Sequence, residues 1–143
     1  MPFSASLVTA VAVQLVCQLF KIVFYSLRER RFLPGYFFSA GGIPSAHTAF
    51  VTALTVSIGF KLGPDSEIFA VSFVFSAIVI YDIVRVRAAV QSHSRILERL
   101  MEKLPVGQRI ELPPAVGHTF PEVLIGLAVG GGLAAAAGWL LQF

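Results

Sequence analysis

Two short segments of this chain each place a histidine beside small or helix-starting residues, at the beginning of a long apolar stretch. They are Gly41-Gly42-Ile43-Pro44-Ser45-Ala46-His47 and Gly117-His118-Thr119-Phe120-Pro121-Glu122. A neutral imidazole can act as a nucleophile, and a protonated one can donate a proton near neutral pH. Because two of the three histidines occupy these matched positions, we interpret them as residues that bind or react with a ligand.

The composition predicts that membrane-spanning helices position these residues. Of the 143 residues, 56% are hydrophobic and 13% are charged, which is too little polar surface for a soluble domain. A bilayer core about 30 Å thick takes about 20 helical residues. Four apolar stretches come near this length, and they cover residues 5–25, 44–60, 68–84 and 121–141. We therefore expect an all-α, polytopic membrane bundle of about four transmembrane helices that forms a single domain over residues 1–143.

The distribution of basic residues predicts the orientation of this bundle. A short turn, residues 61–67, joins the second and third stretches, whereas the other two connections are long and basic. Together with Lys21, these two connections hold all of the eleven lysines and arginines except Lys61. The positive-inside rule then places both long connections in the cytoplasm and both termini outside a cell membrane.

The connection before the last stretch contains a further predicted helix, over about residues 88–104. Apolar side chains form one stripe along it, and charged side chains cover the rest. Such a helix lies at the membrane surface beside anionic headgroups, or it is solvated and packs on the spans. The sequence leaves both arrangements open.

The last apolar stretch carries small residues at every fourth position, and these predict close helix packing. The residues are Gly126, Gly130, Ala134 and Gly138. Faces of this kind let helix backbones approach one another. They would pack the last span within the chain or against a second copy in a homo-oligomer, and the sequence does not separate the two.

With the predicted orientation, the unusual polar residues all lie at one membrane face. Ionisable residues within spans are costly and usually mark function. The beginnings of the second and fourth spans add free N–H groups and the positive end of the helix dipole, which favour an anion. Gly42 would let the backbone approach a ligand closely. We therefore predict a phosphate-binding site formed by Lys21, Arg28, Gly42, Ser45, Asp82 and Arg87, beside His47, His118 and Glu122.

Several of these residues also have simpler structural interpretations. Ser45 is suited to cap the second span, and Thr119 with Glu122 matches a capping box. Lys21 would reach the headgroups from a span without touching a ligand. Asp82 would pair with Arg87 at the interface. These interpretations do not account for His47 and His118 together.

Three segments of the chain resemble the type-2 phosphatidic acid phosphatase and vanadium haloperoxidase superfamily, and in particular its small divergent branch. They read Gly41-Gly42-Ile43-Pro44-Ser45-Ala46-His47, Tyr81-Asp82-Ile83-Val84-Arg85-Val86-Arg87, and Gly117-His118-Thr119-Phe120-Pro121-Glu122-Val123. Lys21 and Arg28 also have the spacing of the superfamily's first motif. The sequence departs from the superfamily pattern at Glu29, Ala46, Leu112 and Glu122, and from the pattern of the divergent branch at Arg85. Leu112 stands where the superfamily has an arginine, and Arg87 would supply the missing phosphate contact.

The resemblance implies a role for each of the central residues. His118 would attack phosphorus and form a phosphohistidine, Glu122 would orient it, and His47 would protonate the leaving oxygen. The expected activity is hydrolysis of a lipid phosphate or diphosphate at the cytoplasmic face. It needs no metal or other cofactor, and the partner is a membrane lipid with a phosphate headgroup rather than a nucleic acid.

Two alternatives remain open at this stage. In the first, the protein binds or translocates a phosphorylated lipid without hydrolysing it. The presence of Leu112 in place of the superfamily arginine favours this alternative. Alternatively, His47, His118, Asp82 and Glu122 form a zinc or manganese site. The basic surroundings disfavour a cation at that place.

Overall fold

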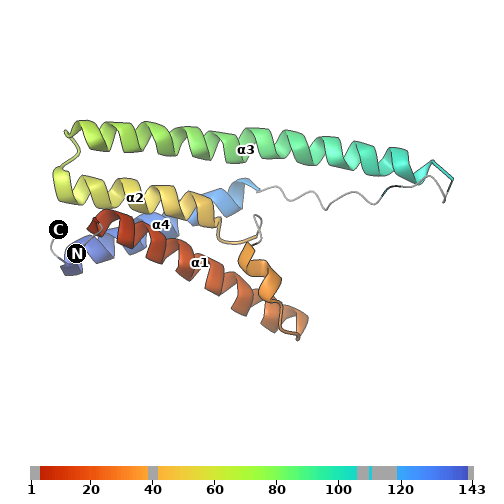
Figure 1. Ribbon diagram of the computed structural model, residues 1–143, viewed down its shortest axis with the longest axis horizontal. Helices are drawn as coiled ribbons and strands as arrows, with labels where there is room; N and C mark the ends of the chain where they lie inside the picture. The colour runs from red at the N-terminus through yellow and green to blue at the C-terminus, as the bar shows by residue number, and fades with distance from the viewer. Residues whose placement is uncertain (1–3, 39–41, 106–109, 111–118, 142–143) are drawn as a thin grey trace.

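The computed structural model describes residues 4–38, 42–105, 110 and 119–141, and these residues are almost entirely helical. The elements in chain order are α1 (Ala5–Glu29), the short 3-10 helix η1 (Pro34–Phe38), α2 (Ala46–Leu62), α3 (Glu67–Glu102) and α4 (Phe120–Leu141). Figure 1 shows α2 and α3 running alongside one another, with α1 and α4 inclined to α2 on its other side. Three helices, α1, α3 and α4, are long and apolar enough to cross a membrane, and α2 is a shorter apolar helix. The predicted all-α membrane bundle is confirmed.

The first helix continues one turn beyond its predicted end at Tyr25. The added residues include Leu27, Arg28 and Glu29, which are good helix formers and give no reason for the helix to stop. Arg30 closes α1 in a left-handed conformation, with φ of 52°, and its N–H donates to carbonyl oxygens of the last turn. The end of α1 therefore lies beyond the apolar stretch that predicted the span.

The third span and the helix predicted after it form one continuous helix. α3 has 36 residues, which corresponds to a length of about 54 Å at 1.5 Å per residue. No glycine or proline lies between Glu67 and Glu102 to break it. The separate surface helix predicted over residues 88–104 is thus replaced by the second half of α3, which ends at Glu102. Figure 1 shows this half extending past the other helices.

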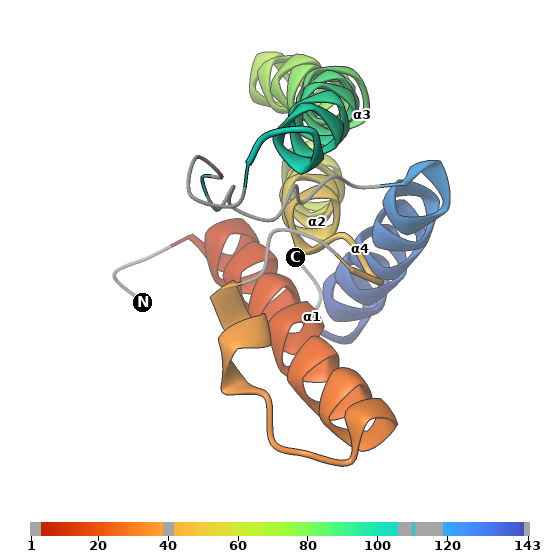
Figure 2. The same cartoon turned by 90° about the vertical axis from the view of Figure 1, so that its right-hand side faces the viewer.

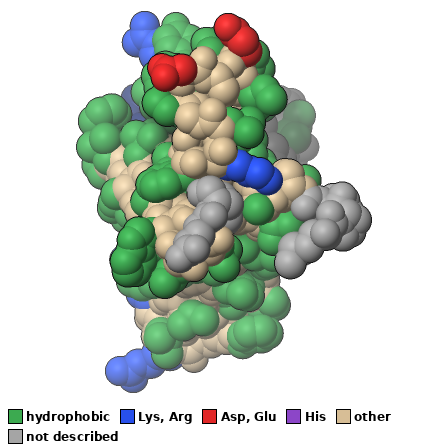
Figure 3. Space-filling view, turned by 90° about the vertical axis from the view of Figure 1, so that its left-hand side faces the viewer, with side chains coloured by type: hydrophobic (Ala, Val, Ile, Leu, Met, Phe, Trp, Pro, Cys, Tyr) green, Lys and Arg blue, Asp and Glu red, His purple; other side chains and the backbone are tan. Residues whose placement is uncertain are grey.

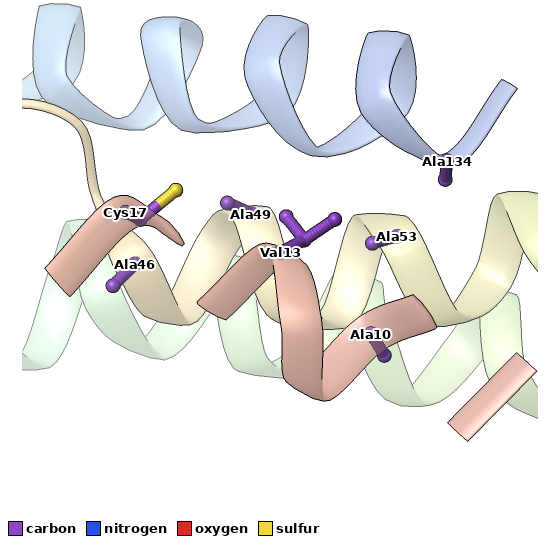
Figure 4. Packing of buried hydrophobic residues seen from close by; sticks show 7 residues of the cluster. All are labelled: Ala10, Val13, Cys17, Ala46, Ala49, Ala53 and Ala134. Atoms are coloured by element: carbon purple, nitrogen blue, oxygen red, sulfur yellow. The ribbon is translucent and has the colours of Figure 1, made fainter. Parts of the chain in front are cut away.

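α2 lies in the middle of the bundle. Viewed from the end where α2 and α4 begin, α3 is on one side of α2, and α1 and α4 are on the other (Figure 2). The buried core between α1, α2 and α4 consists mainly of small side chains: Ala10, Val13, Cys17, Ala46, Ala49, Ala53 and Ala134 (Figure 4). Because these side chains are short, the helix backbones pack closely.

The small-residue face of α4 packs against α2 within the same chain. A methyl group on Gly126 would lie 2.7 Å from the carbonyl oxygen of Ser45, and one on Gly130 would overlap the backbone of Ala49. Gly138 faces the ring of Phe60 in the same way. The alternative left open by the sequence is therefore decided in favour of intramolecular packing for this face. Self-association of the protein stays a prediction and would need another surface.

This packing makes Gly130→Ala a destabilising change. The added methyl group has no space beside Ala49, so we expect a loss of about 1–3 kcal/mol in the free energy of unfolding. Gly132→Ala on the same helix is the matched control, since a methyl group there meets no atom within 4 Å. Thermal unfolding of both variants in detergent tests the prediction. Equal stability of the two variants would contradict the packing of α4 on α2.

The outer surface of the bundle is apolar, as expected for helices in contact with lipid. Large hydrophobic side chains are exposed on each spanning helix, including Leu19 on α1, Val71 on α3 and Trp139 on α4. Figure 3 views the end where the chain termini lie and shows hydrophobic side chains around much of the perimeter, with acidic side chains near the beginning of α3. In water such a surface would favour aggregation. The exposed surface therefore supports a membrane location.

Candidate functional site

The site is organised around the beginnings of α2 and α4, which lie side by side at the same end of the bundle (Figures 1 and 2). The Ser45 N–H donates a hydrogen bond to the carbonyl oxygen of Glu122, at 3.2 Å. This bond joins the two segments that the sequence analysis singled out, although they are far apart in the chain. The predicted convergence of the second and fourth spans is therefore present in the structure.

Both helix beginnings are capped by the residues that the sequence indicated. The Ser45 hydroxyl accepts from the N–H of Thr48 and exchanges a hydrogen bond with the Thr48 hydroxyl, at 2.9 Å. The Thr119 N–H donates to the Glu122 carboxylate at 3.1 Å, and the Glu122 N–H donates to the Thr119 carbonyl. Ser45 is fully buried. The structural interpretations of Ser45 and Glu122 are thus confirmed, and Ser45 contributes a fixed helix beginning rather than an exposed hydroxyl.

Lys21 is the most unusual side chain of this region. It is only 1% exposed, although it lies in an apolar helix, so it does not extend to the headgroups. Cys17, one turn earlier in α1, and Glu122, at the beginning of α4, both lie close enough to Lys21 to influence its amino group electrostatically. A buried charge requires such partners. The packing therefore brings Lys21 of α1 near Glu122 at the beginning of α4.

His47 and Gly42 lie next to the place where α2 and α4 begin. His47 is the second residue of α2 and is half-buried, with its Nδ1 atom inside the protein. Gly42 has φ of +90°, and a methyl group there would lie 2.8 Å from the Tyr25 hydroxyl. Only glycine meets both conditions without strain. The segment entering α2 is therefore held closely against α1.

A pair of tyrosines supports this segment and was missed by the sequence analysis. The rings of Tyr25 and Tyr36 stack, with centroids 4.4 Å apart and an interplanar angle of 12°. The pair links the last turns of α1 to η1. The position of Tyr25, one helical turn after Lys21 and on the same face, is the signal that would have identified it.

Two of the predicted phosphate-binding residues are not brought into contact with Lys21. Arg28 is exposed in the last turns of α1, two helical turns beyond Lys21. Asp82 is also exposed on α3. The antiparallel register between α2 and α3, fixed by hydrogen bonds of Thr55 with Ser72 and Ser76, brings Asp82 level with Ser45 along the bundle. Both residues therefore lie near this end of the molecule, with their side chains directed away from the core.

The remaining site predictions fall outside the described parts of the chain. They concern His118 and the side chain of Arg87. In the part that the structure describes, no group of three histidine, cysteine or carboxylate side chains is arranged to hold a metal ion. Thr119, which follows His118 directly, is fixed by its hydrogen bond to Glu122.

The fold and the site define a helical membrane protein with a buried lysine near the place where two helices begin. The chain matches the Divergent PAP2 family over residues 4–133, and it belongs to that family. The resemblance predicted from the sequence motifs is confirmed. The chain is also similar to the uncharacterized membrane protein YuiD of Bacillus subtilis (strain 168), with 30% identity over 95 residues. The matched region covers 66% of this chain and 60% of YuiD. No solved structure matches the chain.

Proposed function

We propose that this protein is a membrane-embedded phosphatase that hydrolyses a lipid phosphate or diphosphate at the cytoplasmic face of a cell membrane. The proposal rests mainly on the buried Lys21 at the joined beginnings of α2 and α4. A buried ammonium group beside two helix N-termini provides positive potential for a phosphate group. Membership of the Divergent PAP2 family supports the same class of reaction.

In the proposed first step, an imidazole nitrogen of His118 attacks phosphorus. A bond between nitrogen and phosphorus forms, and the bond from phosphorus to the lipid oxygen breaks. His47 donates a proton to this leaving oxygen, so that a lipid phosphate leaves as the alcohol and a lipid diphosphate leaves as the lipid monophosphate. In the second step, water gives a proton to His47 and attacks the phosphohistidine. The nitrogen–phosphorus bond breaks, which releases inorganic phosphate and restores both histidines.

The described geometry supports this division of roles. Glu122 fixes Thr119, the neighbour of His118, through a backbone hydrogen bond, so the carboxylate is suited to orient the nucleophile. His47 lies two residues after Ser45, the cap residue of the adjacent helix α2. The Ser45 N–H donates a hydrogen bond to the carbonyl oxygen of Glu122. Lys21 would stabilise negative charge on the phosphoryl oxygens during transfer. Arg28, Arg87 and the backbone at Gly42 are the proposed additional phosphate contacts, with Asp82 beside them.

Phosphate release by the purified protein tests the proposal. The substrates are lipid phosphate monoesters and diphosphates in detergent micelles, assayed with and without orthovanadate. We expect release from at least one lipid, with inhibition by vanadate because it mimics the pentacoordinate transition state of phosphoryl transfer. Chelators should leave the rate unchanged. Lipid-phosphate binding to vesicles without release from any substrate would instead favour the non-catalytic alternative, in which the protein binds or moves the lipid.

A further inference from the structure

A cavity of about 200 Å³ lies between α1, α4 and the segment entering α2. All of its lining residues are apolar or weakly polar: Val16, Cys17, Phe20, Ile43, Pro44, Ile125 and Val129. Figure 4 shows the Cys17 sulfur on the side of α1 that faces α4. The cavity therefore occupies the space between two helices that are long enough to span a membrane.

This cavity lies next to the candidate site. Cys17 lies one helical turn before Lys21, and Ile125 lies one turn after Glu122. On the third side, Pro44 directly precedes Ser45. The residues that form the cavity are thus held by the same three segments as the Lys21–Glu122 interaction, one turn deeper in the bundle.

The surroundings of the cavity determine the chemistry of its occupant. Its rim residues Val16 and Phe20 are about half exposed, as is much of the outer surface of α1. In a membrane these side chains face hydrocarbon, where no water is available to polar groups. An occupant with peptide or sugar groups would leave its polar atoms unsatisfied here. A hydrocarbon chain has no such cost.

We propose that this cavity binds the hydrocarbon chain of a phosphate-bearing lipid, in the part of the chain nearest the headgroup. The headgroup then lies at the Lys21–Glu122 end. This inference rests on the proposed function for the position of the phosphate. It adds that a lipid-binding surface lies between α1 and α4, and that a lipid chain, in addition to the phosphate, determines recognition.

A second cavity provides an internal comparison. It has a volume of about 340 Å³, and its lining includes Phe73, Ala77 and Leu127. Thr55 and Ser76 also line it, and they form buried hydrogen bonds between α2 and α3. This cavity lies farther from Lys21 and Glu122 than the first one. A lipid with its phosphate at the candidate site should therefore occupy the first cavity.

Tryptophan substitution and photocrosslinking test the inference. Ile125→Trp fills the proposed cavity, and Leu124→Trp is the matched control because Leu124 is exposed on the neighbouring face of α4 and lines neither cavity. The probe is phosphatidic acid with a diazirine in its acyl chain, in phosphatidylcholine vesicles. We expect crosslinks to map to α1 and α4, and Ile125→Trp to reduce them about tenfold, as for a blocked apolar pocket. Leu124→Trp should leave them unchanged.

A second pair of variants guards against loss of folding. Val16→Trp approaches the cavity from α1, and Leu19→Trp is its exposed control on the same helix. Monodisperse elution in detergent shows that a variant is folded. Equal crosslinking in the cavity variants and their controls would overturn the inference, and so would crosslinks that map to Phe73 or Ala77.

Activity measurements separate this inference from the proposed function. If the protein releases phosphate, Ile125→Trp should lower kcat/KM for a long-chain lipid phosphate about tenfold. The rate with a soluble short-chain phosphomonoester should not change. Equal losses with both substrates would count against the cavity. If the unsubstituted protein releases no phosphate from any substrate, the proposed function fails, while the crosslinking result still decides whether the cavity binds a lipid chain.

Discussion

His118→Ala is expected to abolish vanadate-sensitive phosphate release, and His47→Ala to reduce it by about 10²–10⁴-fold, the usual contribution of a general acid. The loss is complete for His118 because no phosphohistidine can form without its imidazole. The smaller loss for His47 reflects a step that water can still perform slowly. Initial rates with a lipid phosphate, at equal amounts of folded protein, provide the measurement.

The chain supplies its own control for this experiment. His93 is the third histidine, and it is exposed on α3, so His93→Ala should retain full activity. The two roles can also be separated by the choice of leaving group. With a phosphate ester of an acidic phenol, which needs little protonation, His47→Ala should recover most of its rate and His118→Ala none. Full activity in either His118→Ala or His47→Ala with the lipid would show that the assigned roles are wrong.

The helices of this protein are largely predictable from sequence because lipid imposes a simple rule on them. Apolar stretches near Ala5 and Pro121 mark the beginnings of α1 and α4 to within about a residue. The ends are less predictable where an apolar stretch passes into polar residues that also favour helix. Glu29 and Glu102 are both such ends. Hydropathy reports where a helix leaves the hydrocarbon, whereas the helix itself stops only where its backbone is capped or broken.

The candidate site was predictable in its members but not in its contacts. The spacing of Pro44, Ser45 and His47 indicated a helix beginning, and the structure has one there. No pattern in the sequence predicts that Lys21 lies near Glu122, since about a hundred positions separate them. Their interaction depends on how closely α4 approaches α2, which Gly126 and Gly130 permit. Small residues of α4 therefore determine which charges lie near one another.

The Lys21–Glu122 interaction is expected to stabilise the fold as well as the site. Glu122→Gln keeps an acceptor for the Thr119 N–H, because glutamine also serves in a capping box, so the change removes charge alone. It leaves the buried ammonium group of Lys21 without its carboxylate. We expect a loss of about 1–3 kcal/mol in the free energy of unfolding, less than for a fully enclosed pair because Glu122 is partly exposed.

A double-mutant cycle isolates the interaction from the other effects of each substitution. Lys21→Met keeps the length and apolar volume of the side chain but removes the ammonium group. In the double variant Lys21→Met/Glu122→Gln no uncompensated charge remains. Its loss in the free energy of unfolding should therefore be smaller than the sum of the two single losses, by about 1 kcal/mol or more. Lys61→Met, at an exposed position on α2, is the control and should change the free energy of unfolding by less than about 0.5 kcal/mol.

Additive losses in thermal unfolding would mean that the charges of Lys21 and Glu122 do not interact. The buried lysine would then need another partner at this end of the bundle. Phosphate added to the unfolding experiment tests whether a bound anion is such a partner, because a bound anion would raise the stability.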